Sequence, residues 1–168
     1  VSSTKRELAV KFSIKSGNPE KLRSACVVVG VYANSKLSDA AARIDDVSKK
    51  FLTKLLHQGD MDGKLGTTLL LHGVAGIESS RVLLVGLGNE KSFTESAFRT
   101  AISAAIKLLN SLGGEDAAIF LTDLKVRKHD AAWRARQATL VTHEACYRFD
   151  SLKSKPSPAK QSLKKVDF

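Results

Sequence analysis

Residues 81–89 read Arg-Val-Leu-Leu-Val-Gly-Leu-Gly-Asn, and this stretch decides the fold class of the chain. It is an unbroken apolar run, rich in branched side chains and closed by two glycines. Such a run is typical of a strand that is buried on both faces, as in a parallel sheet covered by helices. We therefore predict that residues 81–88 form the central strand of an α/β domain.

Three further strands are predicted on the N-terminal side of this stretch. Residues 67–72 are separated from residues 81–88 by a short turn only, so these two strands are expected to form an antiparallel hairpin. Residues 25–32 are nearly all β-formers and predict a second, deeply buried strand. Apolar residues alternate with small or polar ones over residues 8–14, which predicts an edge strand. The sheet is therefore expected to be mixed.

Two helices are predicted from their capping residues. Ser38 can cap a helix with apolar residues at three-to-four spacing, and Gly59 is its expected end. Ser92 or Thr94 can cap a second helix, and Ser92 with the glutamate three residues later fits a capping box. Gly113-Gly114 is the expected end of this second helix. Each helix has one apolar stripe and would cover a face of the sheet.

The order of the remaining segments completes the fold prediction. Residues 117–121 predict a short buried strand, and residues 130–147 predict a further helix. Buried strands joined through a helix call for a right-handed crossover and parallel pairing. Residues 1–150 are therefore predicted to form a three-layer α/β/α domain with a mixed, mostly parallel sheet. From residue 151 the composition changes to Ser, Lys and Pro, which predicts a basic linker over residues 151–168.

Length and composition exclude several classes of protein. The 168 residues suit one domain, and no apolar stretch approaches the ~20 residues that span a bilayer, so no membrane partner is expected. Cys26 and Cys146 are too few and too far apart for a disulfide framework or a zinc site. We interpret both as reduced core residues, which favours a cytoplasmic location.

No catalytic constellation is found in the sequence. Gly86-Leu87-Gly88 resembles a phosphate-binding turn, but Lys91 stands where a third glycine is expected. His143-Glu144 resembles the start of a zinc-binding helix, but Tyr147 stands where the second histidine is required. A plain strand-to-helix turn and an ordinary surface histidine are the simpler interpretations. We therefore assign no catalytic, cofactor-binding or metal-binding residue.

A basic stretch near Trp133 is the remaining candidate site, in a chain of net charge +10. Its cations are candidates for contact with nucleic acid: Lys125, Arg127, Lys128, Arg134 and Arg136. Basic residues beside an aromatic ring can bind nucleic acid, because they combine charge with a stacking surface. The simpler interpretation is a solvated helix face with one buried tryptophan. Both interpretations remain open.

Two segments of the chain resemble the leucyl (cytosol) aminopeptidase family. Residues 145–155 read Ala-Cys-Tyr-Arg-Phe-Asp-Ser-Leu-Lys-Ser-Lys, similar to the segment in which a helix of that family ends and a basic linker begins. Residues 81–88 are similar to a strand of the same family's N-terminal domain, and Phe98-Arg99 fits the helix that follows. The resemblance extends over essentially all of the chain.

The resemblance implies a non-catalytic N-terminal α/β domain, related in fold to macro domains. In the family this domain precedes a catalytic domain that binds two divalent metal ions, manganese or zinc, and releases N-terminal amino acids from peptides. The resemblance also implies a cytoplasmic homo-hexamer in which the N-terminal domain supports assembly or regulation. The family's metal-binding segment Asn-Thr-Asp-Ala-Glu-Gly-Arg does not occur in this sequence. The chain alone is therefore predicted to be inactive.

Two alternative functions are left open. Some bacterial members of the family act as DNA-binding regulators through this domain, so the resemblance and the positive charge together allow a nucleic-acid-binding module. The relation to macro domains also allows an ADP-ribose binder that would use residues 86–89. Each alternative predicts a different ligand, so binding measurements distinguish them.

Overall fold

The computed structural model describes residues 10–151 and 163–168, without the side chains of residues 148–151. Among these described residues, seven strands form one sheet, whose order is β1-β7-β6-β2-β5-β4, with β3 paired to β2 outside this path. The strands are β1 (Lys11–Ser13), β2 (Cys26–Tyr32), β3 (Lys36–Leu37), β4 (Thr68–His72), β5 (Arg81–Gly88), β6 (Asp116–Ile119) and β7 (Lys165–Asp167).

The sheet is mixed and mostly parallel, as predicted. β1, β7, β6, β2 and β5 pair in parallel along the path, whereas β4 pairs with β5 in the antiparallel direction. In the β4–β5 hairpin Leu70 lies opposite Leu83, and the two strands are joined by a short turn. The predicted hairpin is therefore confirmed. β1 is an edge strand, as predicted, although the part of residues 8–14 before residue 10 lies outside the described residues.

β5 is buried along residues 82–87, but it is not the central strand. β5 lies between β2 and the edge strand β4, whereas β2 is buried throughout and has parallel neighbours on both sides. The crossover from β5 to β6 therefore passes over β2. The prediction of a central strand at residues 81–88 was wrong because both strands are continuous apolar runs, and a run of this kind does not reveal the order of strands.

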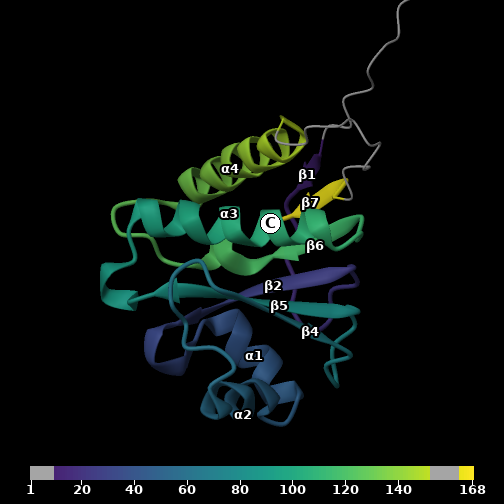
Figure 1. Ribbon diagram of the computed structural model, residues 1–168, viewed down its shortest axis with the longest axis vertical. Helices are drawn as coiled ribbons and strands as arrows, with labels where there is room; N and C mark the ends of the chain where they lie inside the picture. Colours follow the sequence, from purple (N-terminus) through teal and green to yellow (C-terminus); the bar gives the residue numbers. More distant parts are fainter. Residues whose placement is uncertain (1–9, 152–162) are drawn as a thin grey trace, which may run out of the picture.

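In the part of the chain that the structure describes, four α-helices cover the sheet: α1 (Asp39–Val47), α2 (Phe51–Gln58), α3 (Glu95–Ser111) and α4 (Ala131–Ser151). Figure 1 shows α3 and α4 on one side of the sheet and α1 and α2 on the other, which confirms the three layers. One apolar cluster joins the sheet to α3 and α4, and a second joins it to α1 and α2. Among the described residues no helix is both long enough and apolar enough to cross a bilayer.

The helix predicted from Ser38 to about residue 58 is two helices. Lys49 and Lys50 have φ values of 56° and 63°, in the left-handed region, and they separate α1 from α2. The buried carboxylate of Asp45 accepts hydrogen bonds from the backbone N and the Oγ1 of Thr53, at 2.9 and 2.6 Å. Asp45 thus satisfies a donor at the start of α2 that the sequence prediction left inside a continuous helix.

The other helix ends follow the capping residues in the sequence, with one correction. Ser38 and Thr94 each accept a hydrogen bond at 3.3 Å from the backbone N–H three residues later. Thr94 rather than Ser92 therefore caps α3, and the capping box predicted from Ser92 is not formed. Gly59 and Gly113 lie in the left-handed region directly after α2 and after the end of α3. The helix ends predicted from these glycines are confirmed.

The C-terminal residues belong to the sheet. β7 lies between β1 and β6 and pairs in parallel with both, so residues 165–167 are a strand rather than part of the predicted basic linker. Residues 152–162 of that predicted linker lie outside the described residues. The strand predicted over residues 117–121 ends earlier, because β6 is followed by a 3-10 helix, η3 (Phe120–Asp123).

Candidate functional site

The two glycines at the end of β5 donate their backbone N–H groups to carbonyl oxygens of the protein itself. Gly86 N donates a hydrogen bond to Thr67 O at 2.8 Å, and Gly88 N donates to Gly63 O at 2.9 Å. A Cβ atom at Gly86 would lie only 1.9 Å from Lys64 O, so the loop before β4 packs directly on this turn. A phosphate-binding turn needs free amides that point at the anion. These two amides already have partners.

Backbone N–H groups between β5 and the first turn of α3 also have partners. Asn89 Oδ1 accepts a hydrogen bond from Lys91 N at 2.9 Å, and Thr94 caps the helix. Glu95 adds a negative charge in the first turn, where an anionic ligand would otherwise be favoured. These contacts do not support the hypothesis that residues 86–89 bind ADP-ribose. They support the simpler interpretation of a strand-to-helix turn.

The five basic candidates do not form one surface. Lys125, Arg127, Lys128 and Arg136 are exposed, the first three on the loop between η3 and α4 and the last on α4. Arg134 is half-buried instead. Its Nε donates to Thr122 O at 2.7 Å and its Nη1 donates to His129 O at 3.3 Å. Arg134 therefore connects α4 to the preceding loop.

Trp133 is half-buried and already makes ring contacts within the protein. Its ring stacks on His129 with centroids 3.7 Å apart and an interplanar angle of 15°, and it contacts Phe98 at 5.8 Å. Trp133 also packs against the core cluster on the α3–α4 side. Because the ring already has partners within the protein, a nucleic-acid contact here stays a prediction that depends on the exposed cations alone.

A cavity of about 430 Å³ opens where strands β1, β7 and β6 end. It is lined by segments that directly follow these strands and by the first turns of α4. Its charged residues are Lys15, Asp123, Arg134 and Asp167. Burial raises the pKa of Asp123, and the positive charge of Arg134 partly opposes that rise. Ligands of open α/β sheets commonly bind at the carboxyl ends of strands, so this cavity is a candidate binding site.

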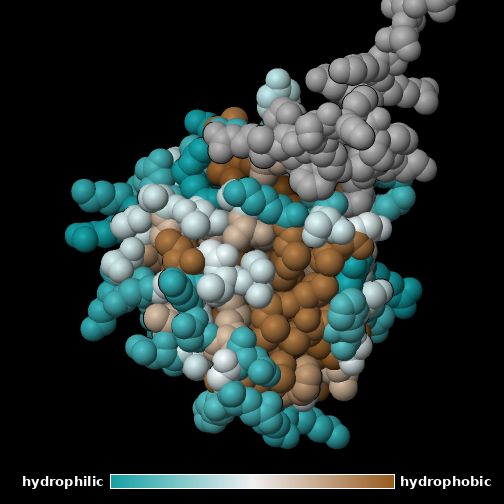
Figure 2. All heavy atoms as spheres, viewed as in Figure 1, coloured by the Kyte–Doolittle hydropathy of each residue, from teal (hydrophilic) through white to brown (hydrophobic). Residues whose placement is uncertain are grey.

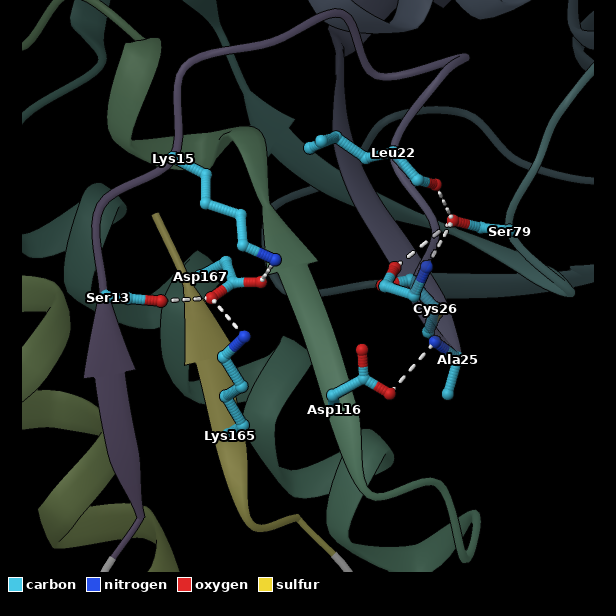
Figure 3. Close-up of polar contacts among 10 residues, drawn as sticks. Ser13, Lys15, Leu22, Ala25, Cys26, Ser79, Asp116, Lys165 and Asp167 are labelled. Carbon is cyan, nitrogen blue, oxygen red and sulfur yellow. Dashed lines mark hydrogen bonds and ion pairs between the residues drawn. The ribbon is translucent and has the colours of Figure 1, made fainter.

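The carboxylate of Asp167 lies at the edge of this cavity and is only 3% exposed. It accepts a hydrogen bond from Ser13 Oγ and forms ion pairs with Lys15 Nζ at 2.6 Å and Lys165 Nζ at 3.3 Å (Figure 3). Burial acts to raise the pKa of Asp167, but hydrogen bonds from Lys15, Ser13 and Lys165 outweigh it and place the pKa below its ordinary value. This cluster ties β7 to β1.

Polar contacts around the start of β2 are structural. Ser79 is buried, and its Oγ donates to Leu22 O at 2.6 Å and accepts from Ser24 N at 3.2 Å (Figure 3). Asp116 Oδ1 accepts a hydrogen bond from Ala25 N at 3.2 Å. These side chains hold the segment that enters β2 and do not form a nucleophile with a base.

A second, larger hollow of about 1020 Å³ follows α3 between α4 and β4. Arg99 crosses it, because its guanidinium contacts the Gln137 side chain and forms an ion pair with Glu144 at 3.2 Å. The wall along α3 is made mainly of small residues such as Ser96, Thr100 and Ser103. Arg99 and Glu144, two of the charged residues that line this groove, therefore pair with each other.

The cysteines and histidines form no recognisable metal site. Within residues 10–151 and 163–168, no group of three or more His, Cys, Asp and Glu side chains could hold a metal ion. Cys26 and Cys146 are buried and not in a disulfide, as predicted, and burial raises the pKa of Cys26 to about 11. The His143 ring contacts Phe12 with centroids 5.1 Å apart.

Sequence comparison identifies the family. Residues 28–156 match the N-terminal domain of the cytosol aminopeptidase family. The chain belongs to this family. It is 50% identical over 157 residues to the "Probable cytosol aminopeptidase" of Methylobacillus flagellatus and 47% identical over 157 residues to that of Nitrosomonas europaea. These matches cover 94% of the chain but 32% of each relative, so the chain spans about a third of the length of these curated relatives. The resemblance found in the sequence is confirmed.

Solved structures agree on the fold. The chain is similar to a tomato leucine aminopeptidase mutant, with a TM-score of 0.72 and 17% identity. The match covers 95% of this chain and 32% of that chain. It is also similar to the macrodomain of Mycobacterium tuberculosis DarG, with a TM-score of 0.63, 9% identity, and 95% and 97% covered. Likeness at such low identity shows the fold alone. The predicted relation to macro domains is confirmed at that level.

Proposed function

We propose that this chain is the non-catalytic N-terminal domain of a metal-dependent leucyl aminopeptidase, whose parent protein releases N-terminal amino acids from peptides. The observation that carries the proposal is the match to an N-terminal domain over residues 28–156, in relatives three times as long. The two divalent metal ions, manganese or zinc, and the reacting groups are assigned to the remainder of the parent. The parent is expected in the cytoplasm.

The carboxylates of the described residues support a structural rather than a catalytic role. A two-metal peptidase site needs clustered carboxylates that are available to the ions. The two buried acids of the described chain are Asp45 and Asp167, and they lie at different places in the fold. Asp45 is hydrogen-bonded to the start of α2, and Asp167 is bound by two lysines and a serine. Both are already used by the fold.

In the parent this domain would pack beside the catalytic domain and support hexamer assembly or regulation. Figure 2 shows hydrophobic side chains gathered over the region where Figure 1 places β2, β5 and β4. Val47 and Phe51, at the junction of α1 and α2, are 42% and 38% exposed. Exposed apolar surface of this kind favours contact with another domain or subunit. These surfaces are the first candidates for the contacts within the assembly.

The direct test of the proposal is a peptidase assay on the purified chain. We expect no release of leucine from a leucyl anilide in the presence of manganese or zinc, because the metal-binding groups are assigned elsewhere. The full-length cytosol aminopeptidase of Methylobacillus flagellatus, assayed identically, is the positive control. Metal-dependent turnover by the 168-residue chain at a rate close to that of the control would show that the domain assignment is wrong.

A nucleic-acid-binding module is the second candidate function, favoured by the net charge of +10 and the exposed cations of the η3–α4 loop. Changing Lys125, Arg127 and Lys128 to Gln should weaken duplex DNA binding and reduce the slope of log affinity against log salt by about 1 for each lost phosphate contact. A control triple variant with the same loss of charge changes three exposed lysines elsewhere: Lys49, Lys54 and Lys107. Equal effects of both triple variants, or no DNA binding at low salt, would exclude a site on this loop.

A further inference from the structure

The cavity at the ends of β1, β7 and β6 contains two opposite charges that do not pair with each other. Arg134 and Asp123 both line it, and within the described part of the chain neither forms an ion pair within 4 Å. Asp123 is exposed and Arg134 is half-buried, so a ligand in the cavity can reach both groups. A ligand that carries both charges could satisfy both groups.

The guanidinium of Arg134 is held in position to bind an anion. Its Nε and Nη1 donate to the carbonyl oxygens of Thr122 and His129, which fixes the plane of the group. Within the described residues its Nη2 has no hydrogen-bond partner. A guanidinium fixed in this way loses little side-chain entropy on binding, and its geometry matches a carboxylate.

The second pair of charges in the cavity is already neutralised. Lys15 Nζ lies 2.6 Å from Asp167, and Asp167 is also bound by Ser13 and Lys165. The charges that remain for a ligand are therefore one cation, Arg134, and one anion, Asp123. A phosphate with two negative charges would gain only Arg134 and would be repelled by the unpaired Asp123, because the carboxylate of Asp167 is already paired. A zwitterion, which carries one charge of each sign, is complementary to the remaining pair.

The rest of the lining is largely apolar. Leu22, Phe120 and Phe168 line the cavity together with several alanines. Ile14 also lines it and is 83% exposed, so a ligand against it would remove apolar surface from water. The volume of about 430 Å³ lies within the range of small-molecule sites.

We propose that this cavity binds a free α-amino acid with a large apolar side chain. The carboxylate of the ligand pairs with Arg134, its ammonium pairs with Asp123, and its side chain packs against Ile14, Leu22 and Phe120. The site goes beyond the proposed function, since it belongs to this domain alone, and its test measures binding to the purified chain without any peptidase activity.

The first experiment compares leucine with analogues that lack one charge. Isothermal titration calorimetry on the 168-residue chain should detect leucine binding at millimolar concentration. 4-Methylpentanoate, which lacks the ammonium, and 3-methylbutylamine, which lacks the carboxylate, should each bind at least about tenfold more weakly. Inorganic phosphate should not compete with leucine. Absence of heat with leucine, equal binding of leucine and either analogue, or competition by phosphate would each overturn the proposal.

The second experiment uses variants with a matched control. Arg134→Gln and Asp123→Asn should each weaken leucine binding at least about tenfold, whereas Arg136→Gln, an exposed arginine on the same helix, should leave it unchanged. Asp123→Asn should not affect binding of 4-methylpentanoate, which has no ammonium. Because Arg134 also bonds two carbonyls, folding of each variant is checked by circular dichroism, and Asp123→Asn decides the test if Arg134→Gln does not fold. Unchanged leucine binding by folded Asp123→Asn would overturn the proposal.

Discussion

The two halves of the sheet differ in what covers their faces. In the half formed by β2, β5 and β4, apolar side chains on one face pack against α3 and those on the other pack against α1 and α2. In the half formed by β1, β7 and β6, one face packs below α3 and α4 through residues such as Phe12 and Val166. Residues that share the other face by register are mostly polar or charged: Lys11, Ser13, Asp116, Lys165 and Asp167.

The half of the sheet that buries apolar side chains on both faces is therefore not the half that contains the buried carboxylate and the candidate cavity. Burial of apolar surface is the main favourable term in folding, and within the described residues the first half of the sheet buries apolar side chains on both faces. The second half contains the buried carboxylate of Asp167 and the cavity with Arg134 and Asp123. The buried carboxylate of Asp167 can be kept there because Lys15, Lys165 and Ser13 lie within reach as its partners.

The largest expected effect is the loss of a large side chain from the doubly covered half. Phe98 on α3 is fully buried, and Phe98→Ala should lower the free energy of unfolding by about 3–5 kcal/mol. Phe12 on the edge strand β1 is only partly buried against the core and stacks on Phe168, so Phe12→Ala should cost about 1–2 kcal/mol. Urea denaturation of both variants measures the difference. Equal losses would show that the two halves contribute equally.

The next effect concerns close backbone contact in the doubly covered half. A Cβ at Gly86 would meet the backbone oxygen of Lys64, whereas a Cβ at Gly30 would meet Leu87 Cδ1 at 2.4 Å. A side-chain end can move aside but a packed backbone cannot, so Gly86→Ala should cost about 3 kcal/mol and Gly30→Ala about 1 kcal/mol. Thermal unfolding of the two variants provides the measurement. A smaller loss for Gly86→Ala than for Gly30→Ala would contradict the tight packing of the loop on β5.

The doubly covered half is also the part that sequence patterns predict well. Residues 25–32 and 81–88 were predicted as buried strands because a continuous apolar run has few other uses in a chain of this size. β7 was missed because Lys-Val-Asp at residues 165–167 has one apolar residue, and its strand conformation depends on pairing with β1 and β6. The break between α1 and α2 was missed because left-handed lysines have no local signal.

The candidate site was the least predictable feature. Arg134 was grouped with the exposed cations because it follows a basic stretch in sequence. The carbonyls of Thr122 and His129, which turn it toward the cavity, become neighbours only when η3 and α4 are packed together. Asp123 and Phe168 reach the same cavity from separate segments of the chain. No spacing rule connects these residues, so their juxtaposition is visible only in the folded chain.

The smallest expected effect tests the polar half through its pH dependence. Asp167→Asn leaves Lys15 and Lys165 without their carboxylate and should lower the free energy of unfolding by about 1–3 kcal/mol at pH 7. The pKa of Asp167 in the folded protein lies below its ordinary value, so the ionised carboxylate stabilises the fold above the unfolded-state pKa. That contribution disappears as the pH falls through the lower, folded-state pKa.

The difference between wild type and Asp167→Asn should therefore be constant near neutral pH and shrink below about pH 4. Asp46 pairs with Lys50 on the protein surface, so Asp46→Asn is the matched control and should show little difference from wild type across the same range. Urea unfolding at a series of pH values gives both curves. A difference for Asp167→Asn that persists unchanged at low pH would mean that the ion pairs of the cluster do not hold β7 against β1, and that the polar half is stabilised by its backbone pairing alone.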